Sequence, residues 1–283
     1  MAGLLSASAI AQAPPVTISA DLYTTLRFDQ GKQARFHLYD DTAQFSRVRL
    51  GIGLENGWFI RVFQKLGTVP NDVDQSTLEE AFIESPGNWA AGKIYTPFGS
   101  GRILRENGYG ARADTELIFL NFPLQVSAIE NGKGRPRGGF VRIGSSAGIS
   151  VAIGEHFGTS ATSLTQIRLP EASPGEGRGY RVVYGADGKL QFGGWTFGGE
   201  LLFLREGHTI LDLEEDIVDG FMTYQFPTGP LVLAELCLTL REGGANFKLS
   251  SEIPFSKNLF VVPILRKYNK TGWSYAITFK VRL

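Results

Sequence analysis

The sequence predicts an all-β protein, an antiparallel transmembrane β-barrel of about sixteen strands. Three observations predict this fold: apolar and polar residues alternate along many segments, short and long connections alternate along the chain, and the composition suits strands. The chain has 283 residues, among them 35 glycines and 20 phenylalanines. Glycine favours turns and aromatic residues favour strands, so this composition points away from a helical protein.

The alternation of apolar and polar residues is clearest at the end of the chain. From Trp273 to Leu283 every second residue is apolar, and the residues between them are Ser, Ala, Thr, Lys and Arg. The same period of two occurs in segments 16–27, 45–54 and 232–241. Residues two apart lie on one face of a strand, so each segment has an apolar and a polar face. A soluble sandwich would turn the apolar face inward, whereas a membrane barrel turns it toward lipid.

The spacing of the strands favours the barrel. We expect strands at 16–28, 44–54, 58–66, 77–84, 89–96, 114–120, 124–130, 136–143, 148–154, 178–185, 190–205, 216–225, 230–241, 245–252, 258–267 and 272–283. Connections after even-numbered strands are short, at 55–57, 85–88, 122–123, 145–147, 186–189, 227–229 and 254–257. Those after odd-numbered strands are mostly longer, at 29–43, 67–76, 97–113, 131–135, 155–177 and 206–215. Short periplasmic turns and longer extracellular loops are typical of outer-membrane barrels, and sixteen strands leave room for an aqueous channel.

Charge and the N-terminal segment narrow the class further. Lysine plus arginine and aspartate plus glutamate each number 28, which argues against binding of nucleic acid through bulk positive charge. Residues 1–13 are small and apolar and end in Ala-Gln-Ala, which indicates the remnant of a secretory signal peptide. No later stretch is long and apolar enough for a transmembrane helix. We therefore expect residues 14–283 to form one barrel domain in the bacterial outer membrane.

A segment near residue 90 carries a family resemblance. Residues 77–99 read TLEEAFIESPGNWAAGKIYTPFG. This hairpin resembles that of bacterial outer-membrane porins, particularly the phosphate-selective porin O and P type. The last strand, 272–283, resembles the assembly signal of outer-membrane proteins, although it ends in Leu283 where an aromatic residue is usual. The resemblance implies a channel-forming barrel, usually a homotrimer, whose partners are outer-membrane lipid and small anions or polar solutes.

The polar faces of the predicted strands supply candidate pore-lining residues. Cationic candidates are Arg27, Arg47, Arg49, Arg61, Lys65, Arg142, Arg181, Lys280 and Arg282, and Glu200 and Glu235 are the clearest acidic ones. Cations that line a water-filled pore create a positive potential, which favours passage of anions. The alternative is that these residues form structural ion pairs along the wall.

The long connection 97–113 is the candidate constriction. It carries Arg102, Arg105 and Arg112 with one carboxylate, Glu106, and its glycines allow it to bend. In general porins the third external loop folds into the lumen, and this segment is the third long connection of the chain. The alternative is a loop exposed at the surface.

The sequence predicts a channel without catalytic residues, cofactor or bound metal. No histidine pair has zinc-binding spacing, and no nucleophile elbow or phosphate-binding loop pattern is present. Two other classes stay open at this point. One is an outer-membrane barrel enzyme, an esterase or a lipid-modifying enzyme, and the other is a soluble extracellular β-domain that binds carbohydrate or protein.

Overall fold

In a computed structural model of the chain, the described residues form seventeen strands and one single-turn helix. It describes residues 15–37, 46–66, 77–117, 122–132, 136–157, 180–206, 213–227, 229–241, 243–268 and 272–283. The first half of the chain contains β1 (Val16–Asp29), β2 (Arg35–His37), β3 (Arg47–Gly53), β4 (Phe59–Lys65), β5 (Leu78–Glu84), β6 (Trp89–Pro97), β7 (Arg105–Leu117), β8 (Phe122–Glu130) and β9 (Arg137–Gly144). The second half contains β10 (Ala147–Glu155), β11 (Tyr180–Phe192), β12 (Trp195–Glu206), β13 (Leu213–Gln225), β14 (Leu231–Thr239), β15 (Gly244–Pro254), β16 (Leu259–Tyr268) and β17 (Gly272–Arg282).

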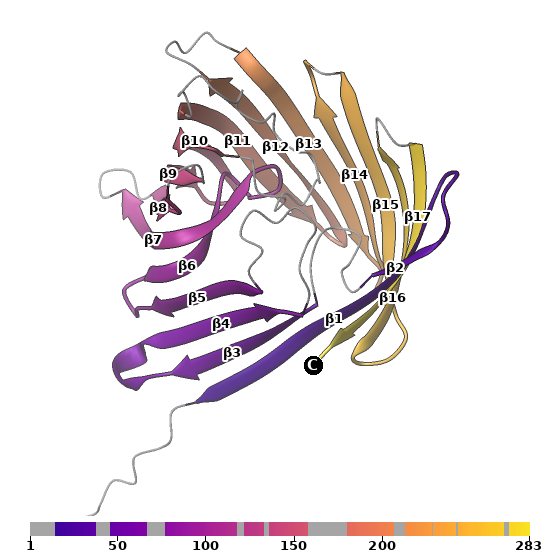
Figure 1. The fold of residues 1–283 in the computed structure, drawn as a ribbon, viewed down its shortest axis with the longest axis horizontal. Coiled ribbons are helices and arrows are strands. Elements are labelled where there is room, and N and C mark those ends of the chain that lie inside the picture. The colour runs from indigo at the N-terminus through magenta and orange to yellow at the C-terminus, as the bar shows by residue number, and fades with distance from the viewer. Residues whose placement is uncertain are drawn as a thin grey trace, which may run out of the picture.

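The strands form one closed antiparallel barrel. From β3 onward each strand pairs with the next one in the chain, and the last strand, β17, pairs with β1. Figure 1 shows this order as a colour run from indigo β1 to yellow β17, which lies beside β1. The three-residue β2 is a short addition that pairs with β1, so the wall consists of the sixteen long strands that the sequence predicts.

Alternation along each strand separates an inner from an outer face. At the seam between β1 and β17, Thr25 and Thr278 are buried and share a hydrogen bond of 2.7 Å between their hydroxyl groups. The next pair in register, Leu26 and Ile277, points the opposite way, and Ile277 is exposed. Because this exposed face is apolar, it is the face that a lipid bilayer covers.

The structure confirms the turn predicted at residues 55–57. It forms the single-turn helix η1 (Glu55–Gly57), in which Asn56 and Gly57 have positive φ angles of 62° and 80°. Among the described residues, no helix has the length and the apolar content needed to cross a membrane.

Two other predicted turns are wrong. Residues 186–189 lie within β11, and the chain turns instead at Gly193 and Gly194. The predicted turn at 122–123 is the start of β8, since Phe122 and Pro123 pair with Leu117 and Glu116.

Several predicted features lie outside the described residues. They are the signal-peptide remnant 1–13, the connection 67–76 and most of 155–177 and 206–215. The predicted loop 97–113 is described in full. It is shorter than predicted, because β7 begins at Arg105 and leaves residues 98–104 as the connection.

Candidate functional site

The hairpin formed by β6 and β7 leaves the barrel wall toward its tip, where its strands no longer pair with β5 and β8. Pairing between β5 and β6 ends at Ala81 and Lys93, and pairing between β7 and β8 begins at Gly110 and Ile129. Residues 94–109 therefore pair only with each other across the hairpin. In Figure 1 the free end of this hairpin, in magenta, points towards β11 and β12.

Gly92 lies at the point where β6 leaves the wall. Its φ angle is 138°, and a Cβ atom there would lie 2.3 Å from the carbonyl oxygen of Ala81. Only glycine fits such a backbone without strain. The bend is therefore built into the sequence at this position.

Side chains replace the backbone partners that the hairpin loses. The N–H of Tyr95 donates to the Glu80 carboxylate at 3.2 Å, and the N–H of Tyr109 donates to the side-chain oxygen of Asn131 at 3.2 Å. The amide of Asn107 donates to the carbonyl of Glu79 at 2.8 Å. Buried backbone groups need such partners, so the departure from the wall is a stable conformation.

The tip of the hairpin lies inside the barrel. Phe98, Ile103 and Leu104 are fully buried and belong to a single apolar cluster with residues of the opposite wall. Those wall residues are Ile129, Phe140, Ala152, Phe157, Val183, Leu202, Leu204, Ile217 and Cys237, from the β8 to β14 side. In β12, Leu202 has no exposed surface, whereas its neighbour Leu201 on the outer face is 40% exposed. The buried cluster thus occupies the inner face, and the segment 98–104 folds into the lumen.

Polar contacts fasten the tip to strands β12, β13 and β14. The hydroxyl of Ser100 and the N–H of Arg102 both donate to Oε2 of Glu200, at 2.6 and 2.9 Å. The Arg102 guanidinium forms an ion pair with Asp219 and another, of 2.8 Å, with Glu235. Burial acts to lower the pKa of Arg102, but Glu235 and Asp219 raise it above its ordinary value. Arg102 therefore stays protonated and paired.

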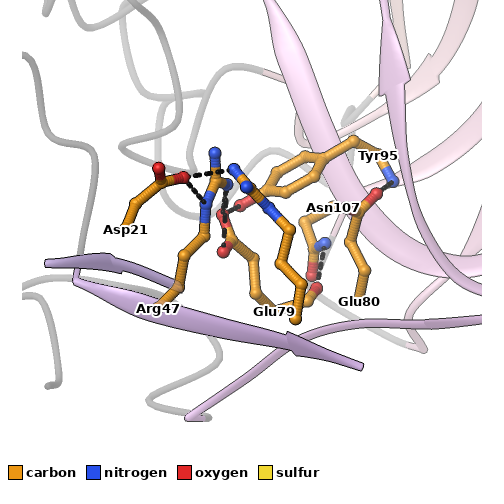
Figure 2. Close-up of polar contacts among 7 residues, drawn as sticks. Asp21, Arg47, Glu79, Glu80, Tyr95 and Asn107 are labelled. Carbon is orange, nitrogen blue, oxygen red and sulfur yellow. Dashed lines mark hydrogen bonds and ion pairs between the residues drawn. The ribbon is translucent and has the colours of Figure 1, made fainter. Parts of the chain in front are cut away.

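A second polar cluster joins the hairpin to the wall of β1, β3 and β5. Figure 2 shows Tyr95, Arg47, Glu79 and Asp21 pointing toward one another. The Tyr95 hydroxyl donates to Glu79 at 3.1 Å, and Arg47 donates to both oxygens of the same carboxylate at 3.3 Å. Arg47 also pairs with Asp21, at 3.6 Å. The hairpin is thus held from two sides of the barrel.

The predicted constriction residues lie in the connecting segment and in β7. Arg102 lies in the connecting segment, whereas Arg105 and Arg112 lie in β7. The Arg105 guanidinium lies 4.2 Å from the centre of the Tyr95 ring, and Arg112 pairs with Asp114 at 3.5 Å. Glu106 has no exposed surface. Only Arg102 of the three arginines therefore lies at the tip.

The predicted wall cations are largely paired with carboxylates. Six of them take part in such ion pairs: Arg27–Asp29 at 2.7 Å, Arg47–Glu79 at 3.3 Å, Arg49–Asp21 at 2.5 Å, Arg61–Glu84 at 2.9 Å, Arg142–Asp187 at 2.6 Å and Lys280–Glu252 at 2.9 Å. Arg282 pairs with the same Glu252 at 3.1 Å. Arg181 has no exposed surface and donates to the carbonyl oxygen of Phe157 at 2.5 Å, and Lys65 is also buried.

Sequence reasoning missed several acidic partners in these clusters. Asp219 and Glu79 lie on strands that do not alternate cleanly, whereas Asp21 lies on the polar face of the alternating segment 16–27 and could have been selected there. In β13, for example, Ile217 and Phe221 lie on the same inner face as Asp219. The cross-strand register supplies the missing signal, because it places Asp219 directly opposite Glu200.

The fold is similar to that of several solved outer-membrane proteins. OmpT of Vibrio cholerae with a deletion in loop L8 aligns with a TM-score of 0.65 and 12% identity, covering 96% of this chain and 100% of that one. OmpF of Salmonella typhi, in complex with daunomycin, gives a TM-score of 0.60 and 11% identity, covering 95% and 97%. The anion-selective porin of Comamonas acidovorans gives 0.56 and 12%, covering 95% and 99%.

No protein-family model matches the sequence, and no curated protein matches it. The similarity to solved structures thus concerns the fold. The barrel matches those of bacterial outer-membrane proteins and porins, in agreement with the fold and the location predicted from the sequence.

Proposed function

We propose that this protein forms a water-filled channel in the outer membrane, through which small hydrophilic solutes diffuse passively. The observation that carries the proposal is the difference in polarity across the wall: the exposed outer face is apolar, whereas the inner face carries paired charged and hydroxyl side chains beside the apolar cluster at the hairpin tip. A polar inner face on a sixteen-stranded barrel is what a hydrated lumen requires.

The folded-in hairpin supports a size limit for the solutes. It reaches from the wall of β5 to the inner faces of β12 and β13, where Glu200 and Asp219 bind it. Since it is fastened on both sides, we propose that it narrows the lumen permanently. Solutes would then pass beside it, along the inner faces of the remaining strands.

The anion preference and the phosphate-selective type remain predictions. The ion pairs of the inner wall argue that any anion preference is weak, because a neighbouring carboxylate cancels much of the field of most of these arginines. A homotrimer is also part of the proposal. One of the similar solved structures is described as a trimer form of OmpT, and the porin resemblance of the sequence points the same way.

The comparisons favour the channel over the two alternatives from the sequence. The similar structures are outer-membrane proteins and porins, and the exposed apolar outer face suits a lipid bilayer better than water.

Planar-bilayer recording of the refolded protein tests the proposal. We expect stepwise, ohmic conductance increases in KCl, and a reversal potential close to zero across a salt gradient. Insertion into the bilayer without any conductance would contradict the channel function.

A further inference from the structure

We propose that Glu200, Asp219, Phe221 and Glu235 form a binding site for a guanidinium cation, which Arg102 fills from within the chain and which a dissolved guanidinium compound can also occupy. We call these four residues the guanidinium site. The inference rests on the proposed channel only in that solutes must reach the lumen.

The contacts of Arg102 are those that recognise a guanidinium group. Its Nε donates to a carboxylate oxygen of Asp219, and its Nη2 lies 2.8 Å from Oε1 of Glu235. The face of the group lies 4.1 Å from the centre of the Phe221 ring. Two carboxylates at the edge and an aromatic ring on the face suit a planar, delocalised cation better than a compact one.

The site has more acceptors than Arg102 uses. Within the described part of the chain, Oε1 of Glu200 and Oδ1 of Asp219 are buried and accept no hydrogen bond. Both residues are only 1% exposed. Buried carboxylate oxygens without a donor are costly, so the site favours a ligand with several N–H groups.

Two further cations lie on this part of the wall. Arg142 binds Asp187, and Lys248 lies opposite Glu235 in the register of β14 and β15. Across the described residues no group of three or more His, Cys, Asp or Glu side chains is arranged to hold a metal ion. The aromatic face of Phe221 and the carboxylates of Asp219 and Glu235 point to a planar organic cation.

The site and its present occupant belong to different parts of the fold. The four site residues lie on wall strands β12, β13 and β14, whereas Arg102 lies on the segment 98–104. The Arg102 side chain is 15% exposed, so its site is not sealed. A tethered group competes with an effective concentration on the order of millimolar. A dissolved guanidinium compound should therefore compete only weakly with Arg102 and bind much better when Arg102 is absent.

Methylguanidinium is a suitable probe, and Arg102→Ala is the variant that empties the site. The refolded full-length variant in detergent is titrated with methylguanidinium chloride by calorimetry. Tetramethylammonium chloride, which has the same charge but no N–H donor, is the control at equal ionic strength. We expect saturable binding of methylguanidinium at least tenfold tighter in Arg102→Ala than in the unaltered protein, and no saturable binding of tetramethylammonium.

The buried thiol of Cys237 gives a second readout, because it lies in the apolar cluster under the segment 98–104. In the unaltered protein, methylguanidinium should raise the rate of Cys237 alkylation several-fold over tetramethylammonium, since displacement of Arg102 loosens this segment. This measurement also serves if Arg102→Ala does not refold.

Two outcomes overturn the proposal. One is a folded Arg102→Ala barrel that binds methylguanidinium no better than tetramethylammonium, and the other is saturable binding that persists unchanged when Asp219→Asn and Glu235→Gln are added. Neither readout requires conductance. A barrel that binds methylguanidinium but conducts no ions would retain the guanidinium site and contradict the channel.

Discussion

Arg102 and Asp219 are separated by 117 residues in the sequence, yet the Arg102 guanidinium donates a hydrogen bond to the Asp219 carboxylate. One residue lies in the connection between β6 and β7 and the other on β13, which is not adjacent to either strand in the barrel. The contact therefore crosses the lumen. Together with the contacts of Glu200 and Glu235, it attaches the hairpin tip to the inner wall.

Removing the Asp219 charge should loosen the tip. In Asp219→Asn, Arg102 keeps its ion pair with Glu235 but loses its ion pair with the buried Asp219 carboxylate. This loss should lower the free energy of unfolding by about 1–3 kcal/mol. Single-channel recordings should show larger current noise and occasional openings above the normal level. Asp216→Asn is the matched control, since Asp216 lies on the same strand and pairs with Arg205, which is not part of the hairpin. Equal noise in both variants would contradict a role of Asp219 in fixing the tip.

The Tyr95 hydroxyl should stabilise the other side of the hairpin. Tyr95→Phe removes the hydrogen bond to Glu79 without changing the ring, and a bond to a charged acceptor contributes about 1.5–3 kcal/mol. We expect a loss near the lower end of that range in urea-induced unfolding followed by tryptophan fluorescence. Tyr275→Phe, on the exposed outer face, is the control and should change stability little. A loss no larger than that of the control would exclude this hydrogen bond as a stabilising contact.

Gly92 should be intolerant of any side chain. Gly92→Ala places a Cβ atom at a φ angle of 138° and 2.3 Å from a backbone oxygen of β5. Backbone strain of this kind costs about 1–3 kcal/mol, so the barrel should refold less efficiently and unfold at lower temperature. Heat-modifiable migration in gel electrophoresis measures both effects. Gly220→Ala, within β13 and with no atom within 4 Å of the added Cβ, should behave like the unaltered protein.

The wall strands could be predicted from the sequence because the alternation of apolar and polar residues depends only on which face of a strand meets lipid. Some of the errors lie at glycines. Asp187-Gly188 is a strong turn signal, but both residues continue β11, and the turn occurs at Gly193, where φ is 56°. Gly108 and Gly110 were also assigned to the connection 97–113, yet they belong to β7. A Cβ at Gly110 would lie 1.9 Å from a backbone oxygen of β8, so this glycine permits close approach of strands.

The inward fold of the 97–113 segment was predictable only in part. The sequence indicated the right connection, but it named Arg102, Arg105 and Arg112 alike, and of these only Arg102 lies in the segment 98–104. It did not indicate the partners, because an ion pair between β13 and a segment more than a hundred residues earlier depends on barrel closure. Nor did it indicate the apolar role of Phe98, Ile103 and Leu104, whose spacing follows neither a strand nor a helix. These contacts depend on residues of distant strands that the closed barrel brings to the tip.

The orientation of the barrel gives a further prediction. An epitope inserted at residue 172, in the connection between β10 and β11, should be accessible to antibody on intact cells. The same epitope between Gly193 and Gly194 should become accessible only after the outer membrane is permeabilised, because this turn lies at the opposite rim. Equal labelling of the two insertions on intact cells, with equal amounts of both proteins in the membrane, would contradict the predicted orientation.

Ion selectivity should depend on the more accessible arginines of the inner wall. The side chains of Arg49 and Arg61 are 30% and 44% exposed, whereas that of Arg102 is 15% exposed and bound by two carboxylates. Replacing both with glutamine leaves Glu84 without its partner and removes two positive charges from the lumen. We therefore expect the reversal potential across a KCl gradient to shift toward cation preference.

Lys32→Gln with Lys257→Gln is the control for that experiment, since it removes the same charge at exposed positions near the two rims. At ~0.15 M salt the Debye length is ~8 Å, so charges at the rims are screened before they act on ions deep in the lumen. The inner-wall pair should thus shift the reversal potential several times more than the rim pair, and the difference should shrink as the salt concentration rises. A rim pair with the same effect would place the selectivity of the channel at its mouths, and the hairpin would then limit the size of solutes without selecting their charge.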